Sequence, residues 1–141
     1  SDLADNLQSK NDSLALCIYA KAEQLSFMNQ LDLALAKLDT IAIAYPNNSL
    51  ADDILMSKAK IAIKQTDFSK AATYFKTIIE TDKNSIWVDD ALFELANLME
   101  KSLNNIDEAK KYYQQLITDY PGSMFNAEAR KRYRNLRGDG V

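Results

Sequence analysis

Small and large apolar residues recur along the chain at a regular interval of about 37 positions. The interval is marked by pairs of alanines, which are Ala22 and Ala34, Ala59 and Ala71, and Ala96 and Ala109. Large apolar residues follow the second alanine of each pair by four and seven positions: Leu38 and Ile41, Phe75 and Ile78, Tyr113 and Leu116. Small side chains let two helices cross closely, and a period of this length is typical of solenoids. The pattern therefore predicts an all-α solenoid of three helix hairpins.

Within each unit, apolar residues spaced three or four apart predict two helices joined by a short turn. The expected helices span Leu14–Met28, Leu31–Ala44, Leu50–Lys64, Phe68–Glu80, Ile86–Ser102 and Ile106–Asp119. A last helix, from Ser123 to Leu136, has no partner and is expected to cap the third hairpin. The expected N-caps are Asp12 or Ser13, Ser49 with Asp52, Asp67, Asn105 and Ser123, and Gly138 is expected to end the last helix.

The repeat phase divides a single domain, residues 1–141, into four parts. We expect hairpins at residues 13–46, 47–83 and 84–121 and the capping helix at residues 122–137. The segment Ser1–Asn11 is mostly polar, and its few apolar residues permit a short separate helix. In the repeat phase, this segment falls where the second helix of an earlier repeat would lie. We therefore expect the chain to be the C-terminal part of a longer protein.

Composition and charge narrow the classes of function. The chain has no histidine, three glycines and one cysteine, and its net charge is -3. Without histidine, a glycine-rich phosphate loop or a Cys/His metal spacing, we expect no catalytic site, no metal and no cofactor. The small charge does not favour a nucleic-acid partner, and no apolar run reaches the ~20 residues of a membrane span. Cys17 lies among apolar residues, and we expect its side chain to be buried.

The spacing of alanines, aromatic residues and closing prolines resembles the tetratricopeptide repeat (TPR). The two alanine positions, the large residue four positions later, and Pro46 and Pro121 match the pattern of that repeat. The opening tryptophan is replaced by an aliphatic residue in each copy, and Lys83 stands where a proline is expected. The resemblance implies a TPR-like solenoid that binds proteins and has no catalytic activity.

Two linker segments resemble a narrower group. Tyr-Pro-Asn-Asn-Ser-Leu-Ala-Asp-Asp at 45–53 and Tyr-Pro-Gly-Ser at 120–123 are similar to the long-linker repeats of bacterial envelope proteins. This group includes outer-membrane assembly lipoproteins of the BAM complex and the periplasmic accessory protein of the Tol-Pal system. The resemblance implies a scaffold in the bacterial periplasm or at the outer membrane, with a protein or peptide as its partner.

In the TPR family, the first helix of each repeat lines a concave groove at its fifth, ninth and twelfth positions. The matching residues are Tyr19, Met56 and Phe93, then Glu23, Lys60 and Asn97, then Ser26, Ile63 and Glu100. The Tyr-Met-Phe row could hold an apolar peptide or a partner helix, and the polar residues would set its register. The alternative is that these residues pack between repeats. We expect Trp87 to pack between repeats.

Adjacent carboxylates occur at one repeat phase, in the pairs Asp52-Asp53 and Asp89-Asp90. Neighbouring helix positions point about 100° apart, so the two side chains of each pair diverge. Acids in a first turn also stabilise the N-terminus of a helix. We interpret both pairs as helix-terminus residues rather than as a catalytic or metal site.

All four arginines lie in the last expected helix, where residues 122–141 carry five basic and two acidic side chains. Arg130, Arg134 and Arg137 share one helical face and could bind an anion, such as phosphate, a lipid headgroup or an acidic protein. The alternative is a solvated outer face whose cations favour the C-terminus of the helix. The sequence thus leaves two functional hypotheses, a groove that binds a protein segment and an anion-binding helix.

Overall fold

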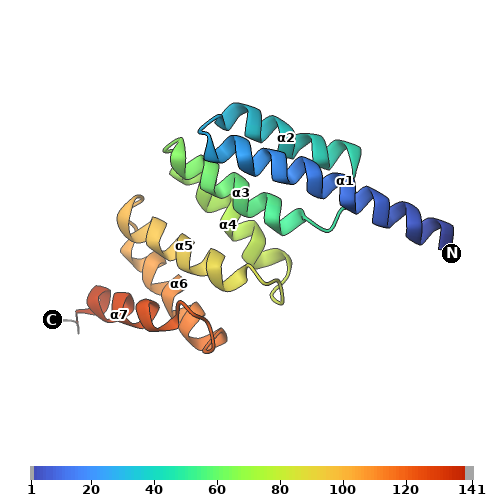
Figure 1. Cartoon of the computed structure of the whole chain (residues 1–141). Coiled ribbons are helices and arrows are strands. Elements are labelled where there is room, and N and C mark those ends of the chain that lie inside the picture. Colours follow the sequence, from blue (N-terminus) through green and yellow to red (C-terminus); the bar gives the residue numbers. More distant parts are fainter. Residues whose placement is uncertain (1, 139–141) are drawn as a thin grey trace.

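The computed structural model describes residues 2–138, which form seven helices (Figure 1). They are α1 (Asp2–Phe27), α2 (Leu31–Ala44), α3 (Ala51–Lys64), α4 (Phe68–Thr81), α5 (Val88–Lys101), α6 (Ile106–Asp119) and α7 (Asn126–Arg137). Within this range there is no strand. Consecutive helices pair as α1–α2, α3–α4 and α5–α6, and α7 packs on α6 (Figure 1). The predicted all-α solenoid of three hairpins and a capping helix is confirmed.

The first helix is longer than expected. The chain from Asp2 to Phe27 is one continuous helix, so the predicted break before Leu14 and the predicted N-caps Asp12 and Ser13 are wrong. No proline or glycine interrupts this stretch, and its polar side chains bond along the helix. The Ser13 hydroxyl donates to the Ser9 carbonyl at 3.1 Å, for example. Ser1, at the start of the expected separate segment, lies outside the described residues.

Each linker between hairpins ends in the same small turn. A side-chain oxygen of Asn48, Ser85 or Ser123 accepts the backbone N–H two residues later, from Leu50, Trp87 and Phe125 respectively. The next helix begins at the following residue. The predicted caps at Ser49 with Asp52 and at Ser123 are therefore wrong, because the turn sets the start of the helix. Inside the hairpins, Asp67 and Asn105 cap α4 and α6 as predicted.

The recurring alanines lie where the helices cross. Five of the six, at positions 34, 59, 71, 96 and 109, are 0% exposed, and Ala22 is 1% exposed. A larger side chain has no room at such a crossing, which explains the repeat pattern. Cys17 differs from expectation because it is exposed: the core-facing side of α1 runs through Ala15, Ala22 and Leu25 instead.

The buried side chains form two separate cores. One core joins α1 and α2 with Ile54 and Ile61, two residues on one side of α3. The other, larger core extends from the opposite side of α3 through α4, α5 and α6 to Ala129 of α7. Contacts between α2 and α3 are sparse compared with those between α4 and α5 or between α6 and α7. The first hairpin is therefore the least firmly attached part of the solenoid.

Candidate functional site

The first helices α1 and α3 are joined by polar side chains on the face where the sequence predicts a groove. The Ser57 hydroxyl donates to Glu23 Oε1 at 2.5 Å and lies 3.1 Å from the Tyr19 hydroxyl. Burial raises the pKa of Tyr19, and its hydrogen bond with Ser57 only partly offsets this. The phenol is therefore neutral at physiological pH, and because the single proton of the Ser57 hydroxyl goes to Glu23, the Tyr19 hydroxyl donates to Ser57.

A hollow lies between α1 and α3 on the same face. Its lining residues are Glu23, Ser26, Phe27, Ser57, Lys60 and Lys64. Lys64 reaches across the hollow and donates to the Ser26 carbonyl at 3.2 Å. The structure thus brings together the predicted groove residues Glu23, Ser26 and Lys60. Sequence reasoning missed Phe27, which is 89% exposed; its place one turn after Glu23 was the available signal.

Most side chains of the predicted apolar row are packed against other residues of the protein. Met56 is only 3% exposed, and the ring of Phe93 stacks on Phe125 of the α6–α7 linker with centroids 4.8 Å apart. Ile63 is half-buried against the larger core. The packing between repeats that the sequence left as an alternative therefore accounts for Met56 and Phe93. The free surface of the predicted groove is concentrated around α1 and α3.

On α5, the predicted groove residues Asn97 and Glu100 both bind Tyr113 of α6. The Tyr113 hydroxyl is 2.8 Å from both Asn97 Oδ1 and Glu100 Oε1, and Arg132 of α7 approaches Glu100 Oε2 at 3.4 Å. Burial and the bond to Glu100 strongly raise the pKa of Tyr113, so its phenol stays protonated. This cluster ties α5 to α6 and α7, which leaves Asn97 and Glu100 less available to a partner.

Two carboxyls one turn apart on α5 lie half-buried near Lys60 of α3. Burial raises the pKa of both Asp90 and Glu94, and the charge of Lys60 acts in the opposite direction. Glu94 was not among the residues singled out from the sequence. The pair gives the α5 side of this face an acidic character, whereas Lys60 and Lys64 make the α3 side basic.

The adjacent acid pairs connect one repeat to the next. Asp53 accepts the Trp87 indole N–H at 3.0 Å, and Asp89 accepts the Ser123 hydroxyl at 2.6 Å. Each bond joins the first turn of one helix to the linker before the next first helix. The predicted inter-repeat role of Trp87 is confirmed. Among residues 2–138, no group of Cys, Asp or Glu side chains is arranged to hold a metal ion.

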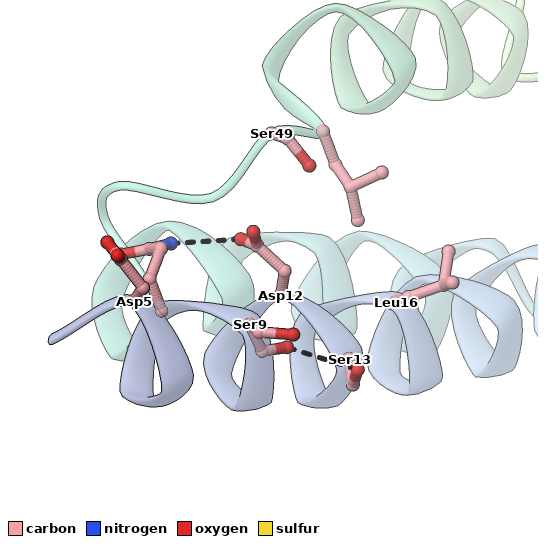
Figure 2. A pocket seen from close by; sticks show the side chains of 8 residues that line it. Asp5, Ser9, Asp12, Ser13, Leu16 and Ser49 are labelled. Atoms are coloured by element: carbon pink, nitrogen blue, oxygen red, sulfur yellow. Dashed lines mark hydrogen bonds between the residues drawn. The ribbon is translucent and has the colours of Figure 1, made fainter. Parts of the chain in front are cut away.

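A second hollow lies beside the first turns of α1, away from the predicted groove. Figure 2 shows its lining, in which Asp5, Ser9, Asp12, Ser13 and Leu16 of α1 lie across from Ser49 of the α2–α3 linker. Gln8 and Leu50 complete it, and Gln8 donates to Asp12 at 3.0 Å. At the next junction Asp53 accepts the Trp87 indole N–H, but here the corresponding residues, 37 positions earlier, are Leu16 and Leu50. The Asp53–Trp87 bond therefore has no equivalent at this junction, where Gln8 of α1 instead donates to the Asn47 carbonyl of the linker at 3.3 Å.

Helix α7 has an inner face similar to that of α5, but its other face carries arginines where α5 has buried residues. Aligned on their linker turns, Ala129, Tyr133 and Leu136 of α7 correspond to Ala91, Leu95 and Leu98 of α5. The predicted anion-binding residues Arg130, Arg134 and Arg137 are exposed and correspond to Leu92, Ala96 and Met99, which are buried in α5. Arg130 Nε donates to Asn126 Oδ1 at 2.7 Å, and the Arg137 guanidinium lies 5.2 Å from the Tyr133 ring centroid. Gly138, with φ of 93°, ends α7 as predicted.

Part of the chain matches a known protein family. Residues 90–123, which contain most of α5 and all of α6, match the family described as tetratricopeptide repeat. A TPR-type repeat is therefore found in the third hairpin. The whole described chain is accordingly a TPR-like α-solenoid, and repeats of this kind are typically non-catalytic scaffolds that mediate protein–protein interaction. No curated protein was found to match the chain. None of the helices within residues 2–138 is long and apolar enough to cross a membrane.

Proposed function

We propose that the protein is a non-catalytic scaffold that binds a peptide or helix of a partner protein on the face of its first helices. The hollow between α1 and α3 carries this proposal, because it combines an exposed aromatic ring with charged groups of both signs. Aromatic anchors beside charged residues are the usual composition of peptide-binding surfaces on proteins.

The residues around the hollow suggest how a segment would be held. Phe27 can pack against an apolar side chain of the partner, and the exposed Lys60 and Lys64 can pair with its carboxylates. Glu23 already accepts the Ser57 hydroxyl, so its orientation is set before binding. A partner segment that carries an apolar residue close to acidic residues would fit these side chains.

The test is selection of peptides from a displayed library on the wild-type protein, followed by affinity measurement with variants. Phe27→Ser combined with Lys60→Ala should weaken the selected peptides about tenfold or more, because an anchor residue is removed. Met124→Ser is the matched control, because Met124 is 86% exposed and lies before α7. Equal affinity for the double variant and the control would remove the hollow from the proposal.

The bacterial cell envelope is the compartment that we propose for this scaffold. The support is the resemblance of the Tyr-Pro linkers, at residues 45–53 and 120–123, to those of envelope proteins. Fractionation of the native protein should find it in the periplasm or with the outer membrane. Recovery from the cytosol would contradict this part of the proposal.

The arginine face of α7 supports a second candidate function, binding of an anion. Arg130, Arg134 and Arg137 are all exposed on one face of the helix. Titration with inorganic phosphate and with an acidic peptide should then show affinities that fall steeply with salt. If a variant with both Arg130→Ala and Arg134→Ala binds these anions with unchanged affinity, the second candidate function is wrong and α7 serves only as a cap.

A further inference from the structure

One side of the first hairpin carries a row of exposed apolar side chains. Leu3, Leu7 and Leu14 of α1 are 80%, 58% and 40% exposed, and their spacing places them on one face of the helix. Tyr19 and Glu23, which contact α3, lie on the opposite face. We term the side of α1 that bears the three leucines the free edge. Leu33 near the start of α2 is also exposed, at 56%.

The repeat register relates the free edge of α1 to one side of α3. Residues 17, 21 and 24 of α1 correspond to Ile54, Lys58 and Ile61 of α3, 37 positions later. In α3, Ile54 and Ile61 are 8% and 1% exposed and belong to the core of the first hairpin. The free edge of α1 therefore corresponds, in the repeat register, to the side of α3 that packs on the preceding hairpin. In α1, residues 17, 21 and 24 are all exposed.

Three lysines lie along this side of the first hairpin. Lys10 and Lys21 lie on α1 beside the leucine row, and Lys37 lies on α2 one turn after Leu33. None of the three lysines forms an ion pair within residues 2–138. The carboxylates Asp5, Asp12 and Glu23 of α1 line the hollows beside α3 instead. The apolar row is therefore accompanied by unpaired positive charge.

At the corresponding position of α3, such a lysine pairs with a helix that lies on the edge. Lys58 Nζ is 2.8 Å from Asp39 Oδ1 of α2. Lys21 occupies the same register position, so a helix lying on α1 as α2 lies on α3 would place a carboxylate within its reach. The same edge of a second copy would bring lysines against lysines, and the exposed face of α7 is also basic.

We propose that the free edge binds an amphipathic helix of a partner protein, and that this helix carries carboxylates that pair with Lys10, Lys21 and Lys37. Its apolar face would cover Leu3, Leu7 and Leu14. This surface is distinct from the hollow between α1 and α3, so the two proposals can fail separately.

The experiment uses a designed amphipathic peptide helix with a leucine face flanked by glutamates, and a second peptide in which lysines replace the glutamates. Binding is measured by fluorescence anisotropy and by the rate at which a maleimide alkylates Cys17. Cys17 is the only cysteine and is exposed at the position of Ile54 in α3. The glutamate peptide should bind and slow the alkylation, and the lysine peptide should bind about tenfold more weakly, as expected for a few exposed ion pairs.

Charge reversal provides the decisive arm. Lys10→Glu, Lys21→Glu and Lys37→Glu together should exchange the preference of the protein for the two peptides, while Lys131→Glu on α7 should leave it unchanged. Phe27→Ser should also leave it unchanged, which separates this surface from the hollow. Equal binding of both peptides, or a preference that survives the reversal, would overturn the proposal. A dimer that protects Cys17 without any peptide would also overturn it, because a second copy would then be the occupant.

Discussion

The two ends of the solenoid are finished in opposite ways. At the C-terminal end, α7 lays Ala129, which is 0% exposed, against the larger core and turns its arginines outward. At the N-terminal end, the first hairpin has its own smaller core and exposes leucines on α1 and α2. Capping elements of solenoids carry a polar outer face, and α7 has one.

The difference shows that equivalent positions of the repeat can be buried in one helix and exposed in another. The positions that hold Leu92, Ala96 and Met99 in α5 are buried, and in α7 arginines at the same positions form an exposed basic face. At the other end, the α1 position equivalent to Lys58 keeps a lysine, which in α3 pairs with a neighbouring helix. The C-terminal end therefore presents a charged face, whereas the N-terminal end presents apolar side chains beside lysines and is suited to receive a helix.

The largest expected effect compares two isoleucines at one register position. Ile41 and Ile78 are both 0% exposed, but Ile41 lies in the core of the first hairpin and Ile78 in the larger core. Replacing either with alanine should cost ~2 to 5 kcal/mol in the unit that contains it. Hydrogen exchange should show Ile41→Ala opening α1 and α2 alone, and Ile78→Ala weakening α3 through α7. Loss of protection over all helices in both variants would break the comparison.

A smaller effect is expected from enlarging the crossing alanines. Ala109→Leu overfills the α5–α6 crossing, where neighbours on both sides prevent a shift, and should lower the free energy of unfolding by ~1 to 3 kcal/mol. Ala34→Leu should cost less because the first hairpin has fewer neighbours to displace. Ala127→Leu, at an exposed position of α7, is the control and should stay within about 0.5 kcal/mol. Denaturant titration measures all three, and a larger loss for Ala34→Leu would contradict the sparse attachment of the first hairpin.

Trp87→Phe tests the bonds between repeats. It keeps most of the ring packing and removes the indole bond to Asp53, so it should cost ~0.5 to 1.5 kcal/mol. The corresponding residues at the first junction are Leu50 and Leu16, which make no such bond. Leu50→Phe should therefore change the free energy of unfolding less than Trp87→Phe does. An unchanged unfolding midpoint for Trp87→Phe would mean that the indole bond does not hold the repeats together.

The smallest effect concerns the half-buried carboxyl of Glu94. Burial raises the pKa of Glu94, so its charged form is less favourable in the folded state than in the unfolded state. The contribution of this group to stability is present below its ordinary pKa and is lost as the pH rises through the raised value. Glu94→Gln should therefore stabilise the protein at pH 7 and give no gain at about pH 4. Denaturant titration at both pH values measures the difference, and an equal effect of Glu94→Gln at the two would contradict it.

The repeat architecture could be predicted because it rests on local periodicity. Alanines at a fixed interval specify close crossings wherever the chain is helical, so all three hairpins and the capping helix follow from spacing alone. The ends of the helices were harder to predict. Ser49 and Ser123 are good N-caps by residue type, but the turns at Asn48 and Ser123 place the helix starts two or three residues further on.

The candidate site was predicted only in part. Glu23, Ser26 and Lys60 line the hollow as the register suggests, but burial of Met56 and stacking of Phe93 on Phe125 depend on how neighbouring repeats sit against each other. Phe27 and Glu94 were missed because their exposure and burial follow from helices that are distant in the sequence.

By itself, the sequence determined the number of hairpins, their crossings and the polar character of the last helix, because each depends on residues a few turns apart. Only the tertiary structure decided which apolar residues are covered. Burial is a property of the neighbours that a side chain meets, and at the free edge of α1 those neighbours are absent within the described chain.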